Sequence, residues 1–98
     1  MIIITGSVRA KAETLDEILK LCLDHVARSR TEPGCISHDV YRSAEDPLRL
    51  FFFELWSGRA AIEAHFAVPA SGQFVRDVGK MADGPTSIEI YDAELAQR

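Results

Sequence analysis

The chain lacks the features that mark membrane-spanning and disulfide-stabilised proteins. Its longest apolar runs, such as Leu50–Phe53, contain four residues, whereas a membrane-spanning helix needs about 20. The N-terminus shows neither the basic region nor the cleavage site of a secretory signal. The two cysteines, Cys22 and Cys35, are too few for a disulfide framework and lie outside any CxxC motif. We therefore expect a soluble cytoplasmic protein with reduced thiols.

Positive charge is also scarce. Eleven Lys and Arg residues stand against fifteen Asp and Glu residues, which gives a formal charge of -4. This is the wrong sign for attraction to phosphate backbones or anionic lipid, so we expect no nucleic-acid and no membrane partner. The sequence also lacks a glycine-rich phosphate loop, a spaced set of metal ligands and a nucleophile beside a base. We therefore predict no metal and no cofactor, which leaves proton chemistry.

The spacing of apolar residues predicts one domain over residues 1–98 with four strands and two helical regions. Branched and aromatic residues indicate strands over residues 1–9, 35–42, 48–56 and 86–92. Thr14 and Glu17 match a capping box at the start of the first helix. Ser57 is the expected cap of the second helical region, which Pro69 restarts.

The order β-α-β-β-α-β predicts an α+β, ferredoxin-like split βαβ fold: a four-stranded antiparallel sheet with both helices on one face. Because successive side chains of a strand alternate, Leu50, Phe52 and Trp56 point to one face of this sheet. The opposite face receives Phe51, Phe53 and Leu55. Two helices can cover only one of these apolar faces. The sequence therefore predicts a homodimer that packs sheet against sheet.

Three groups of residues occur in an order that resembles the antibiotic biosynthesis monooxygenase family. They are Glu32-Pro33-Gly34-Cys35, then Glu54-Leu55-Trp56, then Glu63-Ala64-His65-Phe66 with Pro69 and Phe74 beyond. The resemblance implies a dimeric α+β barrel of the split βαβ fold. It also implies a cofactor-free oxygenase of quinols or aromatic polyketides, or an isomerase of a phosphorylated sugar.

The haem-degrading members of the family are a poorer match. Those enzymes resemble one another in an asparagine on the first strand, a tryptophan in the second helical region and a later histidine. This chain has Thr5-Gly6-Ser7 in the first strand and His65 at the tryptophan's place, with no histidine after it. Many quinol-type and isomerase relatives also have a histidine just after the proline, where this chain has Ala70-Ser71. We therefore do not expect haem ligation.

His65 is the predicted catalytic base, because a histidine has an ordinary pKa of about 6.5 and this position matches the family pattern. His38 and Glu54 are the next candidates. If the hairpin turns about Glu45, His38 lies opposite Phe52 and forms a diagonal pair with Glu54 that orients a base or a substrate hydroxyl. His25, at the margin of the first helix's apolar stripe, receives no role. The predicted walls of an aromatic substrate pocket are Trp56, Phe52, Phe66 and Phe74.

The leading hypothesis is a cofactor-independent monooxygenase, a homodimer that oxidises a quinol-like, phenolic or polyketide small molecule with molecular oxygen. One alternative is a cofactor-free isomerase of a phosphorylated carbonyl compound, which requires cationic contacts from Arg9, Arg42, Arg49 or Arg59. The other is a non-catalytic, dimeric small-molecule binding module, which the Ala70-Ser71 departure favours.

Overall fold

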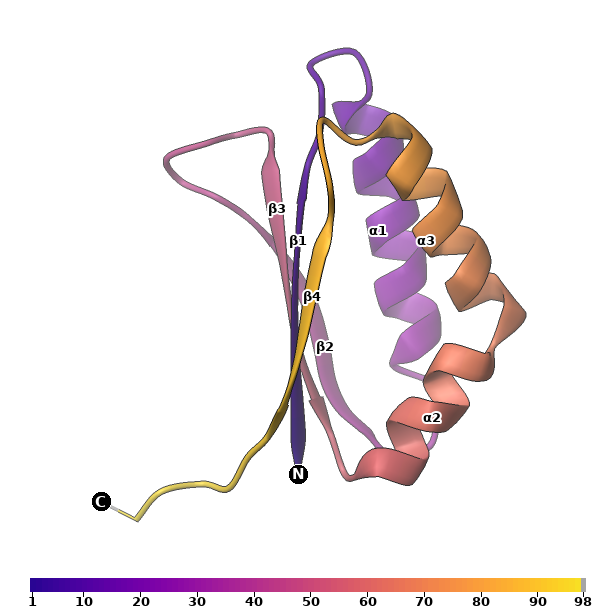
Figure 1. Cartoon of the computed structure of the whole chain (residues 1–98), viewed down its shortest axis with the longest axis vertical. Coiled ribbons are helices and arrows are strands. Elements are labelled where there is room, and N and C mark those ends of the chain that lie inside the picture. Colours follow the sequence, from indigo (N-terminus) through magenta and orange to yellow (C-terminus); the bar gives the residue numbers. More distant parts are fainter. Residues whose placement is uncertain (98) are drawn as a thin grey trace.

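The elements follow the predicted order in the computed structural model, which describes residues 1–97 (Figure 1). The strands are β1 (Ile2–Arg9), β2 (Cys35–Arg42), β3 (Arg49–Trp56) and β4 (Ser87–Asp92). The helices are α1 (Leu15–Ser29), α2 (Arg59–Ala67) and α3 (Pro69–Met81). Proline fixes its own φ and lacks an N–H, which suits the first turn of a helix. The second helical region is accordingly two helices, and α3 begins at Pro69 as predicted.

The four strands form one antiparallel sheet in the order β2-β3-β1-β4. All three helices lie against the same face of this sheet (Figure 1). This is the predicted α+β ferredoxin-like arrangement, with β1 and β3 at its centre. Among the described residues, no helix has the length and apolar character needed to cross a membrane.

Alternation along the central strands decides which side chains form the core. In β1, Ile2, Ile4 and Val8 are buried, and in β3 every second residue from Leu50 to Trp56 is buried. Helix α1 contributes the matching stripe, in which Ile18, Cys22, His25, Val26 and Ser29 are buried. Burial raises the pKa of the Cys22 thiol to about 12, so this cysteine is a packed thiol rather than a nucleophile.

The capping box predicted at Thr14 does not form, and the predicted cap Ser57 is one residue early. Thr14 is the N-cap residue of α1, but its side chain makes no capping hydrogen bond. Its hydroxyl instead lies 3.0 Å from the Met81 carbonyl and accepts a hydrogen bond from the Lys11 N–H. The N-cap residue of α2 is Gly58 rather than Ser57. At Thr14 a tertiary contact that joins the start of α1 to the end of α3 has replaced the local one.

The tight turn at Gly34 explains part of the EPGC motif. Gly34 has a φ of 84°, in the left-handed region that favours glycine. A Cβ at this position would lie 2.5 Å from the Cβ of Ala61. The turn therefore needs a residue without a side chain, both for its backbone conformation and for the close approach of α2.

The β2–β3 hairpin turns one position later than predicted. His38 is paired directly with Glu54, and Phe52 is opposite Val40. The reason is the turn, where the Ser43 hydroxyl accepts hydrogen bonds from the backbone N–H groups of Glu45 and Asp46. Because the pairing shifts by two residues, His38 keeps its predicted face.

Candidate active site

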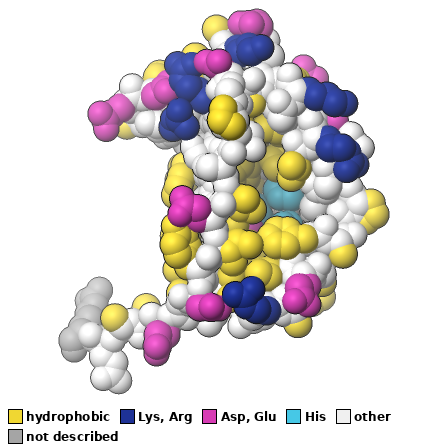
Figure 2. All heavy atoms as spheres, viewed as in Figure 1, with side chains coloured by type: hydrophobic (Ala, Val, Ile, Leu, Met, Phe, Trp, Pro, Cys, Tyr) yellow, Lys and Arg dark blue, Asp and Glu magenta, His cyan; other side chains and the backbone are white. Residues whose placement is uncertain are grey.

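A hollow opens between the sheet and helix α3, and histidine side chains are visible inside it (Figure 2). Its cavity volume is about 210 Å³. The lining is mostly apolar and comes from all three helices and from β1, β3 and the start of β4. It includes the predicted residues His65, Glu54, Phe52, Phe66 and Phe74. His38 and Trp56 are fully buried and belong to the layer behind this lining.

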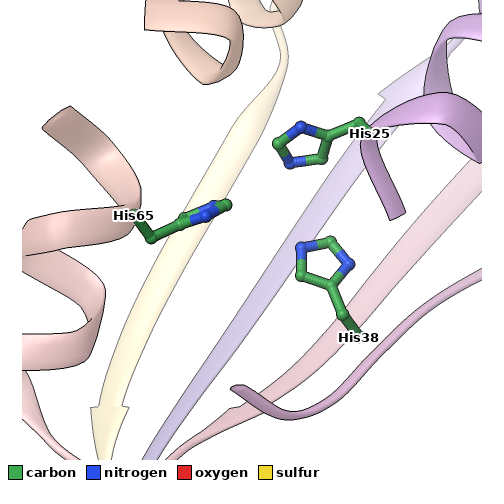
Figure 3. Close-up of side chains that lie close together, drawn as sticks. All are labelled: His25, His38 and His65. Atoms are coloured by element: carbon green, nitrogen blue, oxygen red, sulfur yellow. The ribbon is translucent and has the colours of Figure 1, made fainter. Parts of the chain in front are cut away.

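Three buried histidines converge at the inner end of the hollow (Figure 3). They are His25 of α1, His38 of β2 and His65 of α2, and one ring nitrogen from each lies within 4.8 Å of the others. This cluster was not predicted from the sequence, since its members are spread over three elements and have no metal-ligand spacing. The one local sign of a buried histidine was the position of His25, which lies on the apolar stripe of α1 with Cys22 and Val26.

Glu32 fixes the orientation of His65. The Nδ1 atom of His65 lies 2.7 Å from Oε1 of Glu32, whose side chain is 14% exposed. An ionised carboxylate can only accept hydrogen bonds, so in neutral His65 the proton lies on Nδ1. The Nε2 atom then keeps its lone pair. The Glu32–His65 pair therefore has the form of a general base held by a carboxylate.

Arg28 selects the opposite tautomer of His25, with the proton on the other ring nitrogen. Its guanidinium lies 2.8 Å from Nδ1 of His25, and a guanidinium can only donate. Nδ1 of His25 is therefore the acceptor, and Nε2 carries the proton. Burial, together with the neighbouring His38, His65 and Arg28, lowers the pKa of His25 to about 3. His25 is consequently a neutral hydrogen-bond donor at ordinary pH.

Glu54 joins His38 to Trp56. Its Oε1 accepts a hydrogen bond of 2.9 Å from the Trp56 indole N–H. The same oxygen lies 3.1 Å from Nε2 of His38, but the two groups are poorly aligned for a hydrogen bond. The sequence predicted a His38–Glu54 pair, and the structure brings these residues together directly across the hairpin. The Trp56 indole has its partner within this group and does not reach the cavity.

The three histidines are the described residues that come nearest to a metal site, and catalytic zinc accepts such a set. Each would have to present a lone pair to the ion. The Arg28 contact places a proton on the inward nitrogen of His25, so a metal would have to break that contact to gain a third nitrogen. As long as the Arg28–His25 contact is present, only His38 and His65 of the three histidines can offer a lone pair to a metal ion.

The arginines required by the isomerase hypothesis have other partners. Arg9 pairs with Asp46 and Asp83, and Arg59 lies near Asp92. Arg49 donates to the Ser7 hydroxyl, and Arg42 donates to the Pro47 carbonyl. None of these four arginines is among the described residues that line the cavity. Ser71, two residues after Pro69, does line it, and its buried hydroxyl has no partner in the described structure.

Comparison with known proteins gives matches over most of the chain. The sequence model of one family, described as antibiotic biosynthesis monooxygenase, matches residues 1–77. The uncharacterized protein sll1783 of Synechocystis sp. is 33% identical over 90 residues, which are 92% of this chain and 61% of that protein. The “Putative monooxygenase Rv0793” of Mycobacterium tuberculosis is 31% identical over 65 residues, which are 66% of this chain and 63% of that protein.

Solved structures agree with these sequence matches. One described as an antibiotic biosynthesis monooxygenase has a TM-score of 0.88 and 26% identity, and it covers 97% of this chain and 100% of its own. The match to solved chains is thus nearly complete in length. By contrast, the chain spans about three fifths of the length of the two curated relatives.

Proposed function

The chain belongs to the antibiotic biosynthesis monooxygenase family, and from this premise we propose that it is a cofactor-independent monooxygenase. Its substrate is a quinol-like or phenolic small molecule, and its oxidant is dioxygen. The observation that carries the proposal is the Glu32–His65 pair in the wall of an apolar cavity. A base in such a cavity can create an electron-rich anion while water is kept away.

The chemistry needs little from the protein. His65 Nε2 takes the hydroxyl proton of the substrate, and the Glu32 carboxylate stabilises the resulting imidazolium. The substrate anion passes an electron to dioxygen, and the two radicals combine to form a carbon–oxygen bond. Cleavage of the O–O bond then releases one oxygen as water and leaves the other in the product. For a hydroquinone, the overall reaction converts one hydroquinone and one dioxygen into one hydroxyquinone and one water.

The size of the cavity favours a substrate with one aromatic ring. An apolar protein cavity of about 150 Å³ accommodates benzene, and the cavity here is about 210 Å³. Phe52, Phe66 and Phe74 supply apolar lining against which a flat ring can pack. A single substituted ring therefore fits this space better than a polycyclic polyketide.

The proposal predicts turnover without a metal or a flavin. Protein that has been treated with EDTA and passed through a desalting column should consume oxygen with a methyl-substituted hydroquinone at the rate of untreated protein. The consumed oxygen should equal the quinone formed, because each turnover uses one molecule of each. An oxygen electrode and the absorbance of the quinone measure the two quantities. Loss of activity that returns with added metal would contradict the cofactor-independent reaction.

The same assay separates the two alternatives. An isomerase would convert its substrate at the same rate under argon, whereas the proposed reaction stops. A binding module would show ligand-dependent thermal shifts without oxygen consumption. Among the described residues the Ser71 hydroxyl has no partner, and this favours the binding module as the second candidate, since the hydroxyl offers a ligand contact with no evident catalytic use.

We also propose that the protein works as a homodimer joined through the outer face of the sheet. On this face Phe51 is 41% exposed, and Tyr41 and Tyr91 are exposed as well. Phe53 and Leu55 on the same face of β3 are only half-buried. Large apolar side chains grouped on one face are typical of a protein–protein interface.

Replacing Phe53 with glutamate is expected to give a monomer, because a carboxylate in the centre of the interface loses its water. Light scattering at several protein concentrations measures the mass, and circular dichroism checks that the variant is folded. Leu23→Glu is the matched control, since Leu23 is exposed on α1 and should not touch the partner. If Phe53→Glu does not fold, the milder substitution Tyr41→Glu at the sheet edge can be used instead. It should raise the dissociation constant of the dimer. A wild-type protein that is monomeric throughout would overturn the dimer.

A further inference from the structure

We infer that His25 is a second catalytic residue, which donates a hydrogen bond to the same substrate oxygen that His65 deprotonates. The inference rests on the proposed function and names the group that stabilises the substrate anion. It follows from the placement of protons on two facing imidazoles, and no sequence motif indicated it.

The donor is defined by its partner on the same helix. Arg28 follows His25 by three residues, so the two side chains lie on one face of α1. The guanidinium has no lone pair to offer, so the hydrogen bond at Nδ1 leaves the proton of His25 on Nε2. The ring is also held by a stacked contact with Phe74, at 4.1 Å between ring centroids and 3° between planes. Its N–H therefore has a defined direction.

The acceptor faces it from another helix. His65 is held by Glu32 with its lone pair on Nε2, and the two ring centroids are 5.4 Å apart. Figure 3 shows both rings projecting toward the same space. The nearest ring nitrogens lie within 4.8 Å, and two hydrogen bonds of about 2.8 Å to one oxygen can bridge up to about 5.6 Å. A single substrate oxygen thus fits between a donor and an acceptor.

Both residues line the cavity, so a ligand can reach them. A neutral phenol would donate its proton to His65 and accept from His25. As the proton moves to His65 Nε2, negative charge develops on the oxygen, and the His25 hydrogen bond strengthens. His25 keeps its own proton throughout, and no covalent bond forms to either ring.

A neutral donor is better suited to this task than a charged one. The groups around His25 are Arg28 on its own helix, His38 on β2, Glu54 on β3 and His65 on α2. Burial lowers the pKa of His25 far below that of ordinary histidine. The ring can therefore stabilise the anion without returning a proton to it, and the anion stays available to dioxygen.

The protonation pattern can be measured without any substrate. Long-range ¹H–¹⁵N NMR spectra of the uniformly labelled protein distinguish a protonated Nε2 from a protonated Nδ1. We expect His25 to stay neutral with its proton on Nε2 between about pH 5 and 9. In Arg28→Met the two tautomers should both appear, because the donor that selects one of them is gone. A wild-type His25 with its proton on Nδ1 would overturn the inference.

The effect on an anion can be measured without turnover. 4-Nitrophenol absorbs visible light only as the phenolate, so its spectrum reports the ionisation state of the bound molecule. We expect the wild-type protein to favour bound phenolate, and His25→Phe to lower the ratio of bound phenolate to bound phenol by at least about tenfold. His25→Gln is the matched control, because its amide N–H should restore most of the preference. If His25→Phe does not fold, Arg28→Met can replace it, because it should also lower the ratio of bound phenolate to bound phenol.

The outcomes separate this inference from the proposed function. Phenolate stabilisation that depends on His25, in a protein that consumes no oxygen, would support the inference and reject the monooxygenase. If the protein consumes oxygen, but wild type and His25→Phe show the same ratio of bound phenolate to bound phenol, the monooxygenase is supported and the inference is rejected. A wild-type protein that leaves the ionisation of 4-nitrophenol unchanged, or does not bind it, would also overturn the inference.

Discussion

Replacing His65 with glutamine is expected to lower kcat for oxygen-dependent turnover by about 10²- to 10⁴-fold, the usual contribution of a general base. Glutamine has a similar length and can accept a hydrogen bond, but it cannot take up a proton at neutral pH. The loss should therefore appear in kcat more than in KM, since the walls of the cavity are unchanged. Steady-state oxygen consumption with a saturating hydroquinone measures it.

A matched control and a partner variant make this experiment specific. Glu63→Gln changes an exposed residue of the same helix and should leave kcat unchanged. Glu32→Gln keeps an acceptor for the His65 Nδ1–H but removes the negative charge that stabilises the imidazolium. It should move the acidic limb of the pH profile, where protonation of His65 stops the reaction, to lower pH while it leaves the protein folded. An unchanged kcat in His65→Gln would reject His65 as the base.

Replacing Trp56 with alanine is expected to lower the free energy of unfolding by about 3–5 kcal/mol, the range for removal of a large buried aromatic side chain. The Trp56 side chain is fully buried and packs with Ile2, Ile4 and Ile62. Its loss leaves a cavity beneath α2 and removes the indole N–H that Glu54 accepts. For a domain whose total stability is about 5–15 kcal/mol, this is a large fraction.

Urea denaturation at one fixed protein concentration measures this change, because association contributes to stability. Trp56→Phe fills most of the space and loses only the donor, so we expect a smaller loss of about 1–3 kcal/mol. Leu95→Ala, at a site that is 88% exposed, should change stability by less than about 0.5 kcal/mol. A loss below about 1 kcal/mol in Trp56→Ala would show that this core repacks freely.

The elements were predictable because their signals are local. Alternation in β3 identified both its faces, and the break at Pro69 divided the second helical region. Predictions that depended on one hydrogen bond were less secure. Thr14 found a carbonyl at the end of α3, and Ser43 arranged a longer hairpin turn than expected. In each case a polar side chain had more than one available partner.

The candidate site also has a part that local sequence signals could predict and a part that they could not. His65 could be named from its position in a motif, and Phe52, Phe66 and Phe74 from their apolar setting. The two contacts that give the histidines different roles could not be named. Glu32 lies far from His65 along the chain. Helical spacing puts Arg28 beside His25 but does not decide which group the guanidinium contacts. The convergence of His25, His38 and His65 was missed for the same reason.

Periodicity and chain order by themselves determined that this protein is a four-stranded sheet with helices on one side, because hydrophobic spacing along a strand or helix is written in adjacent residues. Only the tertiary structure decided where the protons lie. Helices α1 and α2 and strand β2 bring the three imidazoles together across gaps in the sequence, and the charged neighbours of His25 and His65 then determine which ring donates and which accepts.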